Sequence, residues 1–425
     1  MAASSRTTGQ TAVLDDLAAT VDGQARAATG DDTVAGVQPR WVAAPASLEQ
    51  ASALLRAAAR LGLTVVPRGR GTALAWGTPP RSADLVVSTE RMATVVEHNP
   101  GDLVCVVDAG ATLDAVNAHV GAHGQQLALD QPVPGASVGG TVSTTRSGPR
   151  RLMYGTPRDQ VLGMTMVRAD GTVATAGSKV VKNVAGYDVA KLLGGAYGTL
   201  GLIGRVVLRL HPRPRARMWL KAWYTDPWAA AGAARRVAGS QLAPSAVEIR
   251  RTVGASAADV LVLLEGTGPG VDGRSRQLLD LLSGATETTD IDTDEGDRLA
   301  RLPVGADDTL VKVAVPLPGV EAVLRTVHAA ESRYGLPCHL QGSAGAGVLY
   351  VVLPAGARAD AVPRVVAELR EAASGGSAVV LQAPPQVRAL VDTWGPVNGL
   401  TLMRRIKDEF DPEHRFSPGR FVGGI

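Results

Sequence analysis

Hydrophobic residues first recur at helical spacing near residue 48. In the stretch PASLEQASALLRAAARLGL, apolar residues fall three and four positions apart, which predicts a helix with one apolar face. Ser47 is a typical N-cap, and Gln50 three residues later completes the pattern of a capping box. Gly62 is a suitable residue to end this helix. A short strand is expected at 63–67, directly before a glycine-rich stretch.

That stretch, VVPRGRGTALAWG, contains glycines that are typical of a phosphate-binding turn. Gly69 and Gly71 match the first two glycines of a dinucleotide fingerprint, but Leu74 occupies the place of the third. In nucleotide folds of this kind the loop opens a helix, because the phosphate binds at the helix N-terminus. Here Pro79 and Pro80 prevent a helix, and ADLVVST predicts another strand. The loop is therefore expected to connect a strand to a strand.

Two further glycine-rich stretches follow. PVPGASVGGTVST comes after a predicted helix at 112–123 and a short predicted strand at 127–129. KNVAGYDVAKLLGGAYGTLGLIGRVVLRL ends in an apolar strand, and an Asp170-Gly171 turn between the two stretches predicts a hairpin. Three glycine-rich loops beside strands favour one long ligand bound by main-chain N–H groups, although any one of them can be only a turn.

The pattern changes after HPRPRAR, where strands and helices alternate in two similar series. This predicts an antiparallel sheet covered by helices on one face, with an internal duplication that sequence identity does not show. The first series has strands at 218–224, 245–251 and 259–265 and a helix at 271–283. The second has strands at 309–315, 338–343, 347–353 and 378–382 and helices at 319–334 and 360–374. A last helix is expected at 398–410, before a glycine- and proline-rich tail.

Composition narrows the class of protein. The 425 residues are 45% hydrophobic and 20% charged, which is typical of a globular chain of two or three domains. The net charge of +3 has no basic stripe, so no nucleic-acid partner is expected. The two cysteines form no C-x-x-C motif, which excludes an iron–sulfur cluster bound by this chain alone, and Cys105 in LVCVVDAG is expected to be buried. Without a signal-like N-terminus or an apolar run of about 18 residues, we expect a cytoplasmic protein that reaches a membrane only through partners.

Seven motifs together resemble the FAD-binding domain of the vanillyl-alcohol oxidase/p-cresol methylhydroxylase superfamily. They are PRGRGTALAWG, GPRR (148–151), RDQVLG (158–163), KNVAGYD (182–188), AYGTLG (196–201), HPRPRA (211–216) and FSPGRF (416–421). Within the superfamily the chain resembles the flavin-binding E subunits of bacterial glycolate oxidases. The resemblance runs from near residue 40 to the C-terminus and is least marked in the second half.

The resemblance implies an α+β protein in which a two-subdomain FAD-binding domain of the p-cresol methylhydroxylase type is joined to an antiparallel-sheet α+β cap domain. The implied division has four parts: an N-terminal segment (1–35), the FAD-binding domain (36–213), the cap domain (214–385) and a C-terminal segment that returns to the FAD-binding domain (386–425).

The resemblance also implies which residues contact FAD. The first loop would surround the pyrophosphate with the main-chain N–H groups of Arg68, Gly69, Arg70, Gly71 and Thr72. The second stretch would continue toward the isoalloxazine with Pro134, Gly135, Gly139, Gly140, Thr141 and Ser143, and the third would meet the adenine half with Gly198, Gly201 and Ile203. The first loop has no histidine, so FAD is expected to bind non-covalently. The alternative for the side chains of Arg68 and Arg70 is solvated loop charge.

Two further positions have alternative interpretations. The superfamily's Asn-Pro-Gly-Arg appears here with Ser417 first and Arg420 last. Arg420 either faces the flavin or an anionic ligand, which makes it the one candidate for a catalytic role, or holds the tail on the FAD-binding domain. For Tyr187 and Asp188 we favour packing and a helix N-cap over a place in the active site.

The chain lacks one motif that the superfamily's 2-hydroxy-acid dehydrogenases use. That motif, H-x-G-D-G-N-x-H, acts with a metal, and His119 and His123 do not replace it because no carboxylate completes a site, so no metal is expected. The resemblance implies a subunit of a glycolate dehydrogenase complex, with a sister flavoprotein oxidising glycolate to glyoxylate and an iron–sulfur subunit carrying the electrons away. The alternatives are a non-catalytic FAD-binding assembly or relay module, and a stand-alone flavin oxidase of another alcohol.

Overall fold

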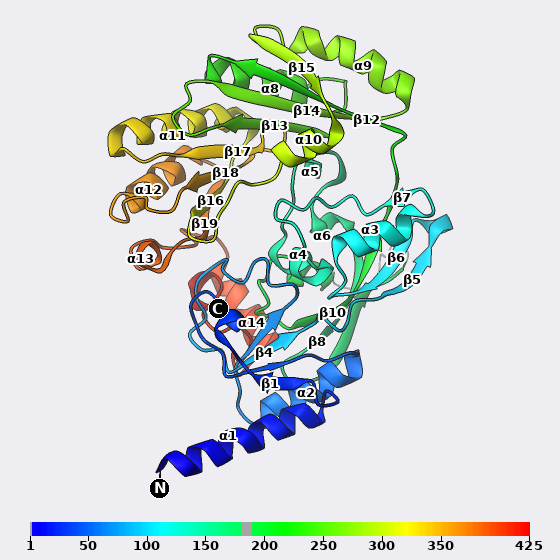
Figure 1. Ribbon diagram of the computed structural model, residues 1–425, viewed down its shortest axis with the longest axis vertical. Helices are drawn as coiled ribbons and strands as arrows, with labels where there is room; N and C mark the ends of the chain where they lie inside the picture. The colour runs from blue at the N-terminus through cyan, green and yellow to red at the C-terminus, as the bar shows by residue number, and fades with distance from the viewer. Residues whose placement is uncertain (1, 180–188) are drawn as a thin grey trace.

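The computed structural model describes residues 2–179 and 189–425, which form an α+β protein of two lobes (Figure 1). The lower lobe in this view contains the N-terminus, two sheets and the returning C-terminal helix. The upper lobe contains one large sheet and its helices. The motif KNVAGYD, with Tyr187 and Asp188, lies outside the described residues. No described helix combines the length and the apolar character needed to cross a membrane.

The first sheet of the lower lobe contains the strand from which the first glycine-rich loop starts. Its strands are, in spatial order, β1 (Ala25–Ala27), β2 (Trp41–Ala43), β4 (Leu85–Ser88) and β3 (Val65–Arg68). β3 and β4 are parallel neighbours, which confirms that the loop between them connects a strand to a strand. Apolar residues of α1 (Ala2–Ala19) and α2 (Leu48–Arg60) pack with this sheet.

The start of α2 follows the prediction in part. The Ser47 side chain accepts a hydrogen bond from the main-chain N–H of Gln50, as expected of an N-cap. The Gln50 side chain, however, accepts from the N–H of Ala46 and donates to Asp22, so the reciprocal capping box is wrong. The Gln50 side-chain oxygen binds the N–H of Ala46, one residue before the N-cap, in place of the N–H of Ser47.

The second sheet of the lower lobe is antiparallel. Its order is β5 (Val95–Asn99), β6 (Val104–Asp108), β10 (Leu202–Arg209), β8 (Val161–Val167) and β9 (Val173–Gly177). The predicted hairpin at Asp170-Gly171 is confirmed as the β8–β9 connection. One face packs against the helices α3 (Leu113–Gly121), α4 (Val138–Thr144) and α7 (Ala190–Leu193), with α5 (Arg151–Tyr154) and α6 (Pro157–Gln160) nearby.

Three expectations for this region are wrong. The predicted strand at 127–129 is instead β7 (Gln125–Gln126), which pairs with β11 (His211–Pro212). The predicted helix at 112–123 ends at Gly121, so His123 lies beyond it. The second glycine-rich stretch is not only a loop, because Ser137 caps α4 by accepting a hydrogen bond from Gly140 N–H at 3.2 Å.

The upper lobe is built on one large sheet with internal symmetry. Its order is β15 (Glu287–Ile291), β12 (Ala216–Tyr224), β14 (Ala258–Gly266), β13 (Ala246–Arg251), β17 (His339–Ser343), β18 (Val348–Leu353), β16 (Thr309–Ala314) and β19 (Ser377–Gln382). The two halves of the sheet have the same strand order. Counted outward from the central β13–β17 pair, the strands of each half come in the order second, third, first and fourth along the chain. The predicted antiparallel sheet and its duplication are thus confirmed at the level of topology.

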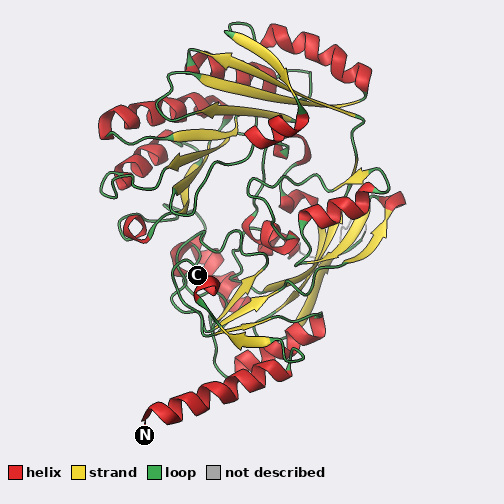
Figure 2. Cartoon of the chain, in the orientation of Figure 1, coloured by secondary structure: helices red, strands yellow, loops and turns green. Residues whose placement is uncertain are grey.

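The two faces of this sheet have different neighbours. The helices α8 (Pro227–Ala238), α9 (Gly268–Leu281), α11 (Val320–Tyr334) and α12 (Val362–Ala372) cover one face (Figure 2). The other face meets the lower lobe, where Trp76 packs with Val348, Tyr350 and Leu381. The short helix α10 (Thr293–Leu299) packs against Trp219 of β12, and α13 (Pro385–Arg388) follows β19 in the chain.

The C-terminal segment returns to the lower lobe, as predicted. The expected helix at 398–410 is α14 (Leu400–Phe410). Beyond it, Phe416 forms a parallel bridge with Val65 of β3 and is almost fully buried. The tail therefore extends the sheet beside the first glycine-rich loop. The exact boundaries of the four predicted domains stay predictions.

Candidate functional site

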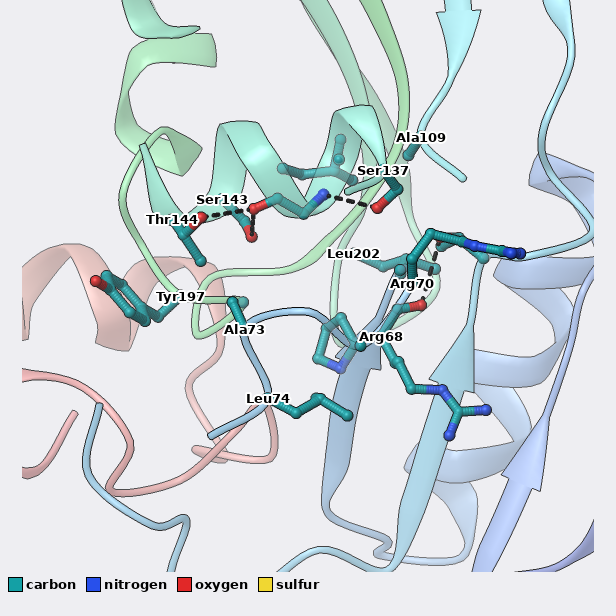
Figure 3. Close-up of a pocket in the computed structure, with 18 of the residues that line it drawn as sticks. Arg68, Arg70, Ala73, Leu74, Ala109, Ser137, Ser143, Thr144, Tyr197 and Leu202 are labelled. Atoms are coloured by element: carbon teal, nitrogen blue, oxygen red, sulfur yellow. Dashed lines mark hydrogen bonds between the residues drawn. The ribbon is translucent and has the colours of Figure 1, made fainter. Parts of the chain in front are cut away.

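A pocket of about 670 Å³, counting the space that opens to solvent, lies where three segments of the lower lobe meet. The segments are the loop after β3 (67–74), helix α4 with its cap (137–144) and the run into β10 (197–203). Figure 3 shows α4 on one side and the first loop on the other, with Tyr197 at one end and Arg70 at the opposite end. The three glycine-rich stretches thus form one elongated site.

Most of the residues predicted to contact a cofactor line this pocket. They are Arg68, Gly69, Arg70, Gly71, Thr72, Gly139, Gly140, Ser143, Gly198, Gly201 and Ile203, and Arg420 joins them. Three others do not line it. Pro134 and Gly135 lie in the exposed loop before α4, and Thr141 is buried in the opposite side of that helix.

The pocket also contains residues that the sequence did not single out. Ser137, Thr144 and Tyr197 line it, together with Ala109 and Leu202. The sequence does indicate Ser137, because a serine directly before V-G-G is a suitable helix N-cap. It does not indicate Tyr197, since its place depends on a left-handed backbone with φ of 54°.

The first loop presents unpaired main-chain donors to this pocket. The N–H groups of Gly69, Arg70, Gly71 and Thr72 donate no hydrogen bond to any other residue that the structure describes. Gly71 has φ of 78°, which favours glycine and allows consecutive N–H groups to turn toward one side. Because these unpaired N–H groups belong to residues that line the pocket, the loop is suited to bind an anionic group.

The comparisons with known proteins agree with this geometry. Residues 39–177 match the family described as "FAD binding domain", and residues 388–421 match "FAD linked oxidases, C-terminal domain". The chain is an FAD-dependent oxidoreductase, and its residues 39–177 match an FAD-binding domain. Arg420, in the second matched segment, lines the same pocket as the loop 68–74 of the first.

Two relatives are similar to this chain in sequence, and one solved structure is similar in fold. Glycolate oxidase subunit GlcD of Bacillus subtilis is 26% identical over 419 residues, 90% of this chain and 88% of the relative. D-lactate dehydrogenase of Archaeoglobus fulgidus is 36% identical over 190 residues, 44% of this chain and 43% of the relative. A p-cresol methylhydroxylase structure superposes with a TM-score of 0.76 at 14% identity, covering 97% of this chain and 96% of that one, which shows a shared fold.

The residues of the pocket fit FAD in this FAD-binding domain. The unpaired N–H groups of the first loop are suited to the pyrophosphate, as predicted. Gly139 in α4 lies so close to Ala109 that a Cβ would approach that residue's Cβ to 2.8 Å. Gly139 thus lets α4 pack tightly against Ala109, the residue that follows β6. When bound, FAD would supply the chemistry of accepting two electrons.

The arginine side chains of the first loop do not point into the pocket, as side chains that bind a phosphate would. Arg68 Nη1 lies 2.7 Å from Asp32 Oδ1, and its side chain points away from α4 (Figure 3). The guanidinium of Arg26 on the same carboxylate lowers the pKa of Asp32 below its usual range. The interpretation of Arg68 as solvated charge is therefore wrong, whereas Arg70 is exposed at the rim.

Arg420 is buried against the first loop. Its Nη2 donates to the carbonyl oxygens of Ala73, Leu74 and Trp76 at 3.1, 2.9 and 3.3 Å. Burial lowers the pKa of its guanidinium to about 10, and no carboxylate among the described residues offsets that burial. The geometry supports the structural alternative, in which Arg420 holds the tail on the loop, while its place in the pocket lining keeps it beside the cofactor.

A second buried arginine, which the sequence did not signal, fixes the same loop. Arg146 Nη2 donates to Thr72 Oγ1 at 2.7 Å, and its guanidinium lies over the Trp76 ring at 5.3 Å from the centroid. Burial lowers the pKa of Arg146 to about 10 as well. Two buried cations without carboxylate partners in the described chain make the surroundings of the loop positive, which favours an anionic cofactor.

The histidines and cysteines offer no alternative chemistry at this site. His98, His119 and His123 gather at the far side of the lower lobe, with ring centroids 4.9–5.4 Å from His98. No group of metal-ligating residues is found in the part of the chain that the structure describes. Burial raises the pKa of both cysteine thiols, Cys105 and Cys338, to about 12, so neither is a thiolate near neutral pH.

Proposed function

We propose that this FAD-dependent oxidoreductase acts on a small 2-hydroxy acid, as a subunit of a glycolate oxidase complex that converts glycolate to glyoxylate. The observation that carries the proposal is the similarity to glycolate oxidase subunit GlcD along 90% of the chain. The FAD-binding half is also similar to a D-lactate dehydrogenase and to a D-2-hydroxyglutarate dehydrogenase. The substrates in these three names share a hydroxyl group next to a carboxylate.

The partners of the proposed complex are a sister flavoprotein and an iron–sulfur subunit. Such clusters are usually held by four cysteine thiolates, and this chain has two cysteines. Both are buried, so electrons that reach FAD must leave through another molecule. The proposal includes a cytoplasmic location, with any contact with a membrane made through the partners. Membership of the E-subunit type, rather than the D type of the Bacillus relative, is part of the proposal.

The test is anaerobic reduction of the purified flavoprotein by candidate acids. The visible flavin spectrum is recorded before and after adding glycolate, D-lactate or D-2-hydroxyglutarate, first with the chain alone and then with the co-purified partners. We expect the flavin absorbance to be lost with at least one of these acids. Reduction only in the presence of the partners would assign the oxidation to the sister flavoprotein and leave this chain as a relay. A flavin that none of the acids reduces in either preparation would refute the substrate class.

A further inference from the structure

A layer of packed side chains separates the FAD pocket from the large sheet. Ala73 and Tyr197 line the pocket and belong to the same apolar cluster as Trp76. Trp76 is 3% exposed and packs with Val348 and Tyr350 of β18. The loop that forms one wall of the pocket therefore continues into a side chain that is packed on the upper lobe. We call Trp76, Tyr197 and Tyr350 the Trp76 layer.

Contacts with both lobes hold Trp76 in this position. The guanidinium of Arg146 lies over its ring, 5.3 Å from the centroid. The carbonyl oxygen of Trp76 accepts a hydrogen bond from Arg420 Nη2 at 3.3 Å. The next residue, Gly77, donates its N–H to the carbonyl oxygen of Leu381 in β19 at 2.8 Å. The backbone beside the indole is thus bonded to the C-terminal tail and to the large sheet, so the ring has a defined place between the lobes.

The Trp76 layer occupies the space that a substrate would need on the side of the large sheet. Hydride transfer requires the reacting atoms to lie about 3–3.5 Å apart, so an acid must lie directly against the flavin. The cavity that Tyr350 lines holds about one water molecule. At the Tyr197 end of the pocket, the rings of Trp394 and Phe421 have their centroids 5.1 and 5.8 Å from that of Tyr197. Side chains rather than free space therefore border this end of the pocket.

The chemistry of the pocket lining agrees with this closure. The described residues that line the FAD pocket include no histidine, aspartate, glutamate or lysine. Burial raises the pKa of the Tyr197 phenol above its usual range, and the pKa of the Arg420 guanidinium, lowered by burial to about 10, keeps that group protonated near neutral pH. Oxidation of a hydroxy acid needs a base for the hydroxyl proton. These walls suit a flavin that exchanges electrons with another cofactor.

We propose that Trp76 keeps the hydroxy acid away from the FAD of this chain, which instead accepts electrons from the reduced sister flavoprotein. The inference rests on the proposed function, which supplies the sister flavoprotein and the iron–sulfur subunit. The acid loses two electrons and two protons at the sister flavin. The two electrons then pass through packed side chains to the FAD of this chain, with protons exchanged through solvent. The iron–sulfur subunit takes these electrons one at a time, and the protons return to solvent.

The test uses sulfite, a small anion that bonds reversibly to an oxidised flavin ring within its reach and removes the visible absorbance. The FAD-loaded chain is titrated with sulfite, and the flavin spectrum is recorded. We expect the wild type to bind sulfite weakly, although the buried cations Arg146 and Arg420 favour an anion. Trp76→Ala is expected to bind it about 10- to 1,000-fold more tightly, because an open state that is about 0.1–10% populated in the wild type becomes the main state.

Three further variants control for the change in packing. Trp76→Phe keeps a ring between the lobes and is expected to bind sulfite as weakly as the wild type. Trp223→Ala is the matched control, because it removes an indole that is 36% exposed on β12 of the upper lobe, and it is expected to leave sulfite binding unchanged. FAD content and the unfolding temperature show whether each variant is folded, and Trp76→Leu provides a milder change at the same position.

The inference and the proposed function can fail separately. If glycolate, D-lactate or D-2-hydroxyglutarate reduces the wild-type flavin without partners, the inference is wrong and the proposed function stands. The inference is also wrong if Trp76→Ala holds FAD fully and binds sulfite no more tightly than Trp223→Ala. Reduction by an acid only with the partners, together with tighter sulfite binding by Trp76→Ala, supports both. If no acid reduces the flavin in either preparation while Trp76→Ala binds sulfite more tightly, Trp76 closes the flavin and the proposed function fails.

Discussion

The backbone of Gly69 lies so close to Ser137 that a Cβ at position 69 would be 2.0 Å from the Ser137 hydroxyl oxygen. Real Cβ atoms do not approach other atoms so closely, so only glycine allows the first loop to lie against the start of α4. That contact fixes the distance between the two walls of the FAD pocket. Ser137 cannot move away freely, because its hydroxyl oxygen also caps α4 through Gly140.

Replacement of this glycine tests the contact. We expect Gly69→Ala to push the loop away from α4 and to cost about 1–3 kcal/mol, as overpacking does, with loss of FAD as the main result. The measurement is the flavin-to-protein ratio after dialysis, together with the dissociation constant for FAD. Gly101→Ala, where a Cβ would meet nothing within 4 Å, is the control and is expected to keep FAD. A Gly69→Ala protein with full FAD content would contradict the role of the contact.

Arg420 offers a test of how the tail supports the first loop. Arg420→Ala removes three hydrogen bonds to loop carbonyl groups and leaves a cavity, so we expect a loss of about 3 kcal/mol in the free energy of unfolding. FAD affinity is expected to fall in parallel, since the loop loses its support. Denaturant unfolding and FAD titration measure the two effects.

Arg420→Lys separates support from charge. Lysine keeps the positive charge, but its side chain is one bond shorter than the path to Arg420 Nη2, the nitrogen that makes all three hydrogen bonds, so we expect most of the stability loss to remain. If Arg420→Lys restores stability and FAD affinity to the wild-type level, the charge itself, rather than the bonds to the loop, is what the site needs.

Much of the fold was predictable because its signals are local. The amphipathic pattern that follows Ser47 predicted α2. Seven of the eight strands of the large sheet were predicted to within two residues, whereas the edge strand β15, whose residues are mostly exposed and polar, was missed. Gly69 and Gly71 indicated the first wall of the pocket, because a loop that connects two strands seldom needs the backbone freedom of two glycines for its turn alone. These patterns depend only on neighbouring residues.

The parts that could not be predicted depend on contacts between distant residues. Arg146 reaches Thr72 across 74 positions of the chain, and Arg151 shares a cavity with Glu248 from the other lobe. No periodicity or motif connects such pairs. The second glycine-rich stretch was misjudged for a local reason, because the cap at Ser137 outweighed the low helix propensity of the two glycines that follow.

The buried pair Lys407–Asp411 anchors the tail and predicts a strong effect of a single change. Lys407 Nζ lies 2.6 Å from Asp411 Oδ2, and both side chains are fully buried. Removing one partner of such a pair costs about 3–5 kcal/mol, since the other charge stays buried alone, and we expect this from Lys407→Met. The double variant Lys407→Met/Asp411→Asn is expected to lose less than the sum of the single variants. Additive losses in denaturant unfolding would show that the two groups do not interact.

Lys312 predicts how stability changes with pH. It lies opposite Tyr350 on the helix-free face of the large sheet, and burial lowers its pKa from 10.5 to about 8. Below pH 8 Lys312 is charged in both the folded and the unfolded protein, and its burial as a cation lowers the free energy of unfolding. Between pH 8 and 10.5 the folded protein has released this proton while the unfolded chain still holds it. The free energy of unfolding therefore rises with pH across this range. We therefore expect Lys312→Met to be more stable than the wild type at pH 7, and the difference to shrink toward pH 10, in urea unfolding of both proteins. Arg364→Met, on the exposed surface of α12, should show no such trend, and a difference that grows with pH would mean that Lys312 is stabilised as a cation.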